Sequence, residues 1–485
     1  MRGFRARAVV AAFAAVAVVV AGSSAGVGAA PAPAGALDPA AVLPSVRYLV
    51  KTFGVSEREA LRRLELQREA VRLDERLRRE AGAEYGGMRL DQEAGGVLVV
   101  SMTKAAAAEP FLAGLDRAHV RTAEVRYSLA DLVKTRDRIA AQVGTGSDAV
   151  YLPAVSEAEN RVVVWERDWV AKEKAVPGVS ATSDAVRRAV SGEPAVVRTL
   201  VKPTPLASTP DVDWGFCHPL YCTDYGPMRG GLRLDMKRDN GTWGGCTSGF
   251  NLRSTGGGFP GKAWVLTAGH CMATKTNNTP TQHNGNDVLA QHGIEKNSYP
   301  YDYAALPYVD AATATTWLDG QPGHNRVLTY CRNGGLDSDA DTPCGQQATS
   351  VDEYITGTHA LAEVRAGWVV CATGSGSSAV NYPDSVDSGA GVDYLVGTRC
   401  GRVLSTDVGI NTDLCARAGD SGGPLFSQVD HTALGILEGS QQSRSGACQS
   451  GELNNYVPID TITTDLSARV AAQGSVFSVI TTPTG

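Results

Sequence analysis

The sequence WVLTAGHC, at residues 264–271, joins a short apolar run to a histidine that lies near its end. A run of this length and composition is typical of a buried β-strand. Similar short runs, separated by Gly, Asn, Asp and Ser, occur at residues 263–267, 366–371, 433–437 and 456–459. This pattern predicts an all-β sandwich or barrel in the second half of the chain, with one helix at residues 460–473 after the last strand.

Two further stretches of this half carry polar residues suited to catalysis. YPYDYAAL (299–306) places Asp302 just before an apolar strand, and AGDSGGPL (418–425) places Ser421 in a glycine-rich turn. A serine hydroxyl becomes nucleophilic at neutral pH when an imidazole takes its proton, and a carboxylate must orient that imidazole. Glycines let the backbone aim two N–H groups at a developing oxyanion. The three stretches therefore predict a triad of His270, Asp302 and Ser421.

TAGHC and GDSGGP, in this order, resemble the motifs of trypsin/chymotrypsin-fold serine peptidases. The long N-terminal segment, with GVSE and EALRRL at residues 54–64, is similar to that of the secreted bacterial branch, the alpha-lytic protease and streptogrisin relatives. The resemblance implies two six-stranded antiparallel β-barrels with a C-terminal helix, preceded by an α+β pro-domain. It also implies a serine endopeptidase that acts on proteins or peptides without a cofactor.

The resemblance assigns a role to each residue of the motifs. His270 is the general base and then the general acid, Ser421 is the nucleophile, and Asp302 orients the imidazole. The backbone N–H groups of Gly419 and Ser421 form the oxyanion hole. Asp287 is a rival for the acid but lies only 17 residues after His270, too few for the strands that usually intervene.

Two other functions deserve comparison. GDSGG also matches the G-x-S-x-G nucleophile elbow of α/β-hydrolases, which would indicate an esterase, but there the acid and the histidine follow the serine. Only 64 residues follow Ser421, and the chain order His–Asp–Ser favours the peptidase. A catalytically inactive relative that serves as a secreted binding protein is the second alternative, and the intact triad argues against it.

Composition divides the chain into two parts. All ten cysteines lie between Cys217 and Cys448, and residues 211–485 carry a net charge of −11 against +5 in the preceding 210, which sums to −6. Neither balance predicts nucleic acid as a partner. No apolar run reaches the roughly 18 residues of a membrane span, so we expect no membrane association after export.

The first part predicts export and a pro-region. Three arginines, an apolar run at residues 8–21 and small residues after it are typical of a secretory signal peptide over residues 1–30, hence of an extracellular protein. We expect a pro-region over residues 31–205 and the protease domain over 206–485, with a mature N-terminus anywhere from about 206 to 230. By resemblance, the pro-region is a folding assistant and inhibitor.

Local patterns within the pro-region predict its elements. SERE at residues 56–59 is a capping box, which starts a charged helix that runs to about Glu80. Residues 96–102 and 161–165 read as strands. The proline-rich stretch at residues 178–210 reads as an exposed linker that is easily cut.

Ten cysteines allow many pairings, and the resemblance narrows them. It implies the disulfides Cys246–Cys271, Cys415–Cys448 and Cys371–Cys400; proximity in the sequence then pairs Cys331 with Cys344 and Cys217 with Cys222. The acidic run at residues 337–341 resembles the start of a calcium loop, but an EF-hand needs Gly at position 342 and Glu at 348, which are Thr and Ala. We therefore expect no metal.

The resemblance also locates the pocket for the side chain before the scissile bond. Two residues before Cys415 lies Asp413, at the floor of the pocket, as in members that select Lys or Arg. The wall aligns with Glu438, Gly439 and Ser440, where Glu438 replaces the usual serine and is a candidate to brace the triad instead. Asp420 needs a cationic partner, and either Arg399 or Arg402 could supply it.

Overall fold

The computed structural model describes residues 37–173, 179–206, 227–272, 276–318, 324–329, 351–375, 398–442 and 450–483. Outside these ranges lie the expected signal peptide, Cys217, Cys222, Cys331, Cys344, Cys448 and the acidic run at residues 337–341. Within the described ranges, no helix is both long enough and apolar enough to cross a membrane.

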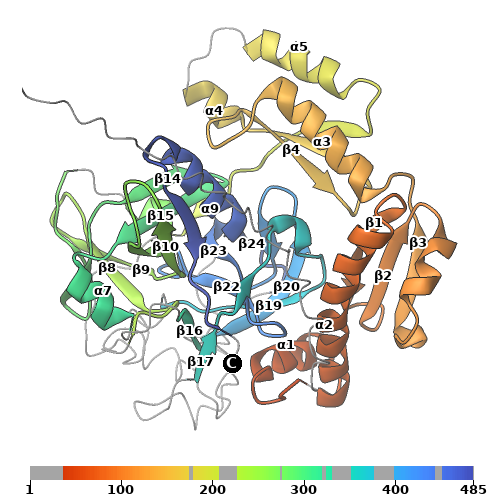
Figure 1. Cartoon of the computed structure of the whole chain (residues 1–485), viewed down its shortest axis with the longest axis horizontal. Helices are drawn as coiled ribbons and strands as arrows, with labels where there is room; N and C mark the ends of the chain where they lie inside the picture. The colour runs from red at the N-terminus through yellow and green to blue at the C-terminus, as the bar shows by residue number, and fades with distance from the viewer. Residues whose placement is uncertain are drawn as a thin grey trace, which may run out of the picture. The chain divides into compact units, whose positions relative to one another are not determined.

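The described chain begins with two helices, α1 (Leu43–Phe53) and α2 (Glu57–Glu80), at the red end of the colour range in Figure 1. Ser56 caps α2 by accepting a hydrogen bond from the N–H of Glu59, so the predicted start and end of this helix are confirmed. A three-stranded sheet follows, in the order β1-β2-β3; its strands are β1 (Tyr85–Asp91), β2 (Val97–Met102) and β3 (Val120–Glu124). Two 3₁₀ segments precede β3, η1 (Ala105–Phe111) and η2 (Arg117–His119).

A second three-stranded sheet, in the order β4-β5-β6, completes the N-terminal part. Its elements are α3 (Leu129–Val143), β4 (Tyr151–Ser156), β5 (Arg161–Glu166), α4 (Asp168–Glu173), α5 (Val179–Val190) and β6 (Ala195–Thr199).

The expectation of an exposed linker over residues 178–210 was wrong for residues 179–206, and the rest of that range lies outside the described residues. Residues 179–190 form α5, and β6 pairs in parallel with β5, with Val197 opposite Val164. Val197 packs against the apolar cluster that contains Val164 and Ile139. The prolines flank this strand instead of interrupting it, which is why their number misled the prediction.

The first lobe of the second half consists of two antiparallel sheets, in the orders β13-β12-β8-β9 and β14-β15-β11-β10-β25. Its elements are β8 (Arg233–Lys237), β9 (Trp243–Thr247), β10 (Asn251–Thr255), β11 (Ala263–Thr267), η3 (Gly269–Cys271), β12 (Thr281–His283), β13 (Asn286–Leu289), β14 (Ile294–Ser298), β15 (Tyr301–Pro307), α7 (Ala311–Trp317) and β25 (Val476–Val479). Every residue of β11 is buried, as its apolar run predicts.

The second lobe is a closed barrel of six strands, because β23 pairs with both β22 and β24 in the ring β23-β22-β19-β20-β21-β24. Its strands are β19 (Val369–Ala372), β20 (Arg399–Ser405), β21 (Ile410–Thr412), β22 (Pro424–Ser427), β23 (Thr432–Ser440) and β24 (Asn454–Pro458). Smaller elements beside it are β7 (Thr204–Pro205), β16 (Arg326–Thr329), β17 (Val351–Tyr354), β18 (Gly357–Thr358), η4 (Leu361–Glu363) and η6 (Ala471–Gln473).

The predicted fold class is confirmed: two antiparallel β lobes form the second half, and the C-terminal helix is α9 (Ile459–Arg469). The lobes differ in closure. The second is the predicted six-stranded barrel, whereas the strands of the first divide between two sheets among the described residues.

Candidate active site

His270 follows the buried strand β11 in the single turn η3. β11 pairs with β15, whose second residue is Asp302, so the pairing brings the acid beside the histidine. Gly269 permits this approach, since a Cβ there would lie 2.8 Å from Asp302 Oδ1 and 2.0 Å from the carbonyl oxygen of Lys296. A larger residue before His270 would push the turn away from the acid.

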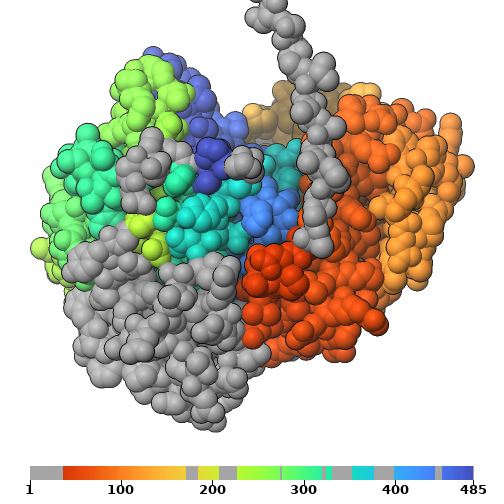
Figure 2. Space-filling model, turned by 60° about the horizontal axis from the view of Figure 1, so that its bottom comes forward, coloured from red at the N-terminus to blue at the C-terminus, as the bar shows by residue number. Residues whose placement is uncertain are grey.

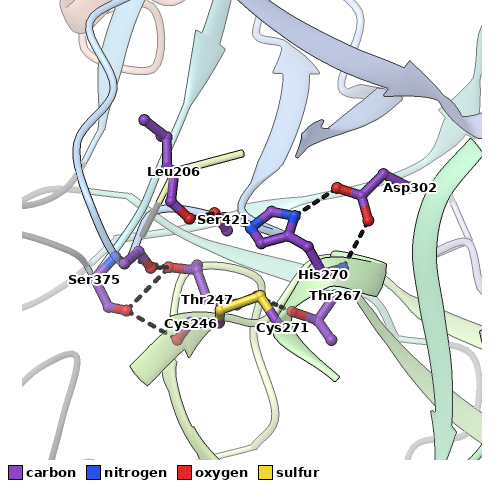
Figure 3. The surroundings of a disulfide bond; sticks show 10 residues. Leu206, Cys246, Thr247, Thr267, His270, Cys271, Asp302, Ser375 and Ser421 are labelled. Atoms are coloured by element: carbon purple, nitrogen blue, oxygen red, sulfur yellow. Dashed lines mark hydrogen bonds and ion pairs between the residues drawn. A yellow bond between two sulfur atoms is a disulfide. The ribbon is translucent and has the colours of Figure 1, made fainter. Parts of the chain in front are cut away.

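The three predicted triad residues form one continuous chain of hydrogen bonds (Figure 3). His270 Nδ1 lies 2.5 Å from Asp302 Oδ2, and the backbone N–H of His270 donates to Asp302 Oδ1 at 2.7 Å. On the other side of the ring, His270 Nε2 lies 2.8 Å from Ser421 Oγ. Two bonds thus hold the carboxylate in one orientation, and the ring nitrogen that faces the serine is positioned to take its proton.

The loop before Ser421 is held by contacts that its glycines make possible. Gly419 adopts φ +89°, which side chains rarely allow, and its carbonyl oxygen accepts a hydrogen bond from Thr247 Oγ1 at 2.7 Å. The backbone N–H of Thr247 donates to the Ser421 carbonyl oxygen at 2.9 Å. Both carbonyl groups of the loop are therefore turned toward β9. This geometry suits the role expected for the N–H groups of Gly419 and Ser421.

Asp420, next to the nucleophile, is fully buried and pairs with Arg399. Arg399 Nη2 donates to Asp420 Oδ2 at 2.9 Å, and the backbone N–H of Arg417 donates to the same oxygen at 2.9 Å. Arg402, the other candidate that the sequence left open, binds Glu93 instead. The ion pair with Arg399 therefore attaches the serine loop, residues 418–425, to strand β20.

Asp413, the residue expected at the floor of the specificity pocket, has its carboxylate occupied by its own chain. It accepts hydrogen bonds from the backbone N–H of Arg402 at 2.7 Å, from Arg402 Nε at 3.2 Å and from the hydroxyl of Tyr48 in α1 at 2.9 Å. Burial raises the pKa of Asp413. The cation beside this acid is an arginine of the same molecule.

Glu438, Gly439 and Ser440 form the end of strand β23. Burial, together with the negative charge of Asp302, raises the pKa of Glu438 well above its usual range.

Sequence reasoning missed a group of residues that lie in this site. Strand β7 pairs with Gly439 and Ser440, and the carbonyl oxygen of Leu206 lies 3.4 Å from Ser421 Oγ (Figure 3). One signal was available: Thr204 precedes a proline, which favours an extended backbone. That preference does not say which strand the segment joins.

Two disulfides implied by the resemblance are present, Cys246–Cys271 and Cys371–Cys400. Cys246–Cys271 ties the residue after His270 to β9, the strand that also holds the serine loop (Figure 3). Cys415 is disulfide-bonded too, and Cys448, its expected partner, lies outside the described residues.

Comparisons with known proteins agree with this picture. Residues 58–113 match the family model "Alpha-lytic protease pro N-terminal". Streptogrisin-D from Streptomyces griseus is 27% identical over 396 residues, which cover 80% of this chain and 76% of that protein. Serine protease 2 from Streptomyces fradiae is 29% identical over 206 residues, 42% of this chain and 90% of that protein.

Among solved structures, Nocardiopsis protease (NAPase) matches at a TM-score of 0.30 and 17% identity, covering 52% of this chain and 100% of that one. That likeness is too weak to add to the assignment. The pro-region match and the similarity to streptogrisin-D over most of both chains make this protein a serine endopeptidase related to the streptogrisins and alpha-lytic protease.

Proposed function

We propose that the chain is a secreted, self-processing pre-pro-enzyme whose protease domain, residues 206–485, hydrolyses peptide bonds with the triad Ser421, His270 and Asp302. The observation that carries the proposal is the unbroken hydrogen-bond chain from Ser421 Oγ through the imidazole to the Asp302 carboxylate. In the proposed domain order, residues 1–30 are the signal peptide and residues 31–205 the pro-region.

Each residue of the triad has one task in the proposed reaction. His270 Nε2 removes the proton from Ser421 Oγ as that oxygen attacks the scissile carbonyl carbon, and later returns a proton to the leaving amine. Asp302 stabilises the imidazolium that forms between these steps and keeps Nδ1 protonated. The N–H groups of Gly419 and Ser421 stabilise the negative charge on the substrate oxygen.

The contacts of the two acids do not favour the preference for Arg or Lys that the sequence predicts. A cationic side chain gains from a carboxylate that lacks another partner. Asp413 is already bound to Arg402, and both burial and the negative charge of Asp302 oppose a charge on Glu438.

Contacts between the pro-region and the second barrel support its proposed role as folding assistant and inhibitor. In Figure 2 the red surface of α1 lies against the blue surface of the barrel, where α1 contacts β19 and β20. Asp74 in α2 forms a buried ion pair with Arg365, at 2.8 Å. Ser45 in α1 donates to Gln428 at 2.6 Å, beside Cys371–Cys400. These contacts cover barrel surface while β7 occupies the active site.

Active-site labelling with a fluorophosphonate, combined with single substitutions, tests the proposal. Wild-type enzyme should carry the adduct on Ser421, and Ser421→Ala should lose both the adduct and about 10⁶ in kcat. Asp302→Asn should lose about 10⁴ in kcat, because the wrong tautomer of the imidazole then faces the serine. Asp287→Asn is the matched control: this acid accepts a hydrogen bond from Gln282 in the β12–β13 hairpin, and activity should persist.

Two outcomes would contradict the proposal. Wild-type activity of Ser421→Ala would show that Ser421 is not the nucleophile. A large loss of activity with Asp287→Asn but not with Asp302→Asn would show that Asp287 is the acid of the triad. If the wild-type protein neither reacts with the fluorophosphonate nor cleaves peptides, the alternative of a secreted, catalytically inactive binding protein would be favoured.

A further inference from the structure

The last described residues of the pro-region lie in the active site as an added strand. Pro205 is opposite Gly439 and Thr204 is opposite Ser440, and the two strands run antiparallel. Gly439 is needed for this approach, because a Cβ there would lie 2.6 Å from the carbonyl oxygen of Thr204. An extended peptide that adds to a sheet edge is held by its backbone, and its side chains are then read by pockets.

This pairing places Leu206 at the nucleophile. Ser421 Oγ lies 3.4 Å from the carbonyl oxygen of Leu206 and within hydrogen-bond distance of His270. Since a C=O bond is about 1.2 Å long, the carbonyl carbon lies within about 5 Å of Ser421 Oγ. The next covalent bond in the chain, Leu206–Ala207, is the one that attack at this carbon would break.

The side chain of Leu206 lies in an apolar environment. It is 4% exposed and belongs to the apolar cluster that includes Ala416, Leu437 and Tyr456. Ala416 comes from the segment before the serine loop, and Leu437 precedes Glu438 in β23. Apolar surroundings of this kind stabilise a leucine by burying it and leave a cationic side chain without a partner.

We propose that the enzyme cuts its own Leu206–Ala207 bond, and that it also prefers leucine before the scissile bond in other substrates. The proposal rests on the proposed function, because it uses the same triad. It replaces the expected preference for Arg or Lys and narrows the mature N-terminus to Ala207.

The chemistry of the step balances within the chain. Ser421 Oγ gives its proton to His270 and forms an ester with the Leu206 carbonyl carbon, while the bond to Ala207 breaks and its nitrogen takes that proton. Water then attacks the ester and gives one proton through His270 to Ser421 Oγ; the other proton leaves the new carboxyl group of Leu206 for the solvent, so that Leu206 ends as a carboxylate. The new carboxyl end of the pro-region can remain paired with β23 and so block the active site.

The test uses the full chain expressed with its own pro-region, with N-terminal sequencing and intact mass of the products. Wild type should begin at Ala207, and Ser421→Ala should stay uncut. Leu206→Arg should slow the cut at this bond at least tenfold. Val201→Arg is the matched control, because Val201 is 65% exposed and lies in the same segment outside the strand pairing; it should be cut like wild type.

A second measurement covers the case in which Leu206→Arg fails to fold. Mature wild-type enzyme is assayed on p-nitroanilide peptides that end in Thr-Pro-Leu, Thr-Pro-Arg or Thr-Pro-Asp. The kcat/KM for the leucine peptide should exceed that for the arginine peptide at least tenfold.

The outcomes separate this proposal from the proposed function. Fluorophosphonate labelling of Ser421 with a mature N-terminus other than Ala207, or with an equal or higher kcat/KM for the arginine peptide, overturns the proposal and leaves the triad standing. Cutting of Ser421→Ala at the same bond overturns self-processing. Absence of labelling and of peptide cleavage overturns the proposed function itself.

Discussion

Substitution of Arg399 by Met removes the cation that neutralises Asp420, the residue beside the nucleophile. Asp420 is 1% exposed and Arg399 is 8% exposed as side chains, and their charged atoms lie 2.9 Å apart. The site around Asp420 is closed: a Cβ on Gly374 would lie only 2.2 Å from Asp420 Oδ1. Met fills much of the volume of Arg399 but removes the guanidinium that lies 2.9 Å from the buried carboxylate.

The size of the effect follows from the burial of the Asp420 carboxylate. Removal of the counter-charge of a buried ion costs about 3–5 kcal/mol of folding free energy. The loss of stability at pH 7 should therefore be about 4 kcal/mol.

Urea unfolding followed by circular dichroism measures this loss, with all variants made in Ser421→Ala so that no chain cuts itself. The control is Arg117→Met, which removes a bidentate pair with Glu109 whose side chains are 53% and 59% exposed. An exposed pair contributes at most about 1 kcal/mol, so the control should change little.

A loss below about 1 kcal/mol at pH 7 would refute the reasoning. If Arg399→Met does not fold, Arg399→Met with Asp420→Asn keeps the test open. Removal of both charges should recover most of the stability, because no buried charge then lacks a partner. A double variant as unstable as the single one would show that the volume of the arginine matters more than its charge.

Two shorter predictions concern other buried charges. Burial opposes the charge of His359, but hydrogen bonds to Asp430 and Glu363 outweigh it and raise the pKa of His359 to about 9. The resulting stability, up to about 3 kcal/mol, is present below pH 6.5 and lost as the pH rises through 9. In His359→Gln, the free energy of unfolding measured with urea should therefore vary less between pH 6 and pH 9.5 than in wild type. Asp74→Asn removes one of the two carboxylates that pair with Arg365, which is 1% exposed and keeps Glu157 at 3.1 Å, and should weaken inhibition of mature enzyme by added pro-region about tenfold; an unchanged inhibition constant would exclude this ion pair as an anchor.

Local chemistry explains what could be predicted about the elements. The helix over residues 57–80 has its own capping residue, and the strand over residues 263–267 is apolar at every position, so neighbouring residues suffice to specify each. The segment over residues 179–206 shows the limit of such reasoning. Its prolines signal a break in local structure, but Val197 is covered by residues of β5 and α3 that local sequence does not reveal.

The candidate site divides in the same way. His270 and Ser421 lie in motifs that can be recognised from the sequence. The glycines of these motifs are needed there, because Gly419 has a positive φ and Gly269 leaves no room for a Cβ. Asp302 could only be ranked above Asp287 by spacing, and the pairing of β11 with β15 brings it to the imidazole. Asp413 could be placed by counting from Cys415, but counting says nothing about what binds its carboxylate.

Local sequence was enough to predict the all-β character of the second half, the charged helix of the pro-region and the motifs of the triad, because each depends on residues within a few positions of one another. Long-range contacts, in contrast, pair Arg399 with Asp420, bind Tyr48 and Arg402 to Asp413, and bring Leu206 to Ser421. Tyr48 is 365 residues from Asp413, and Leu206 is 215 residues from Ser421. Contacts of that range depend on how strands pair and sheets close, which no local pattern encodes.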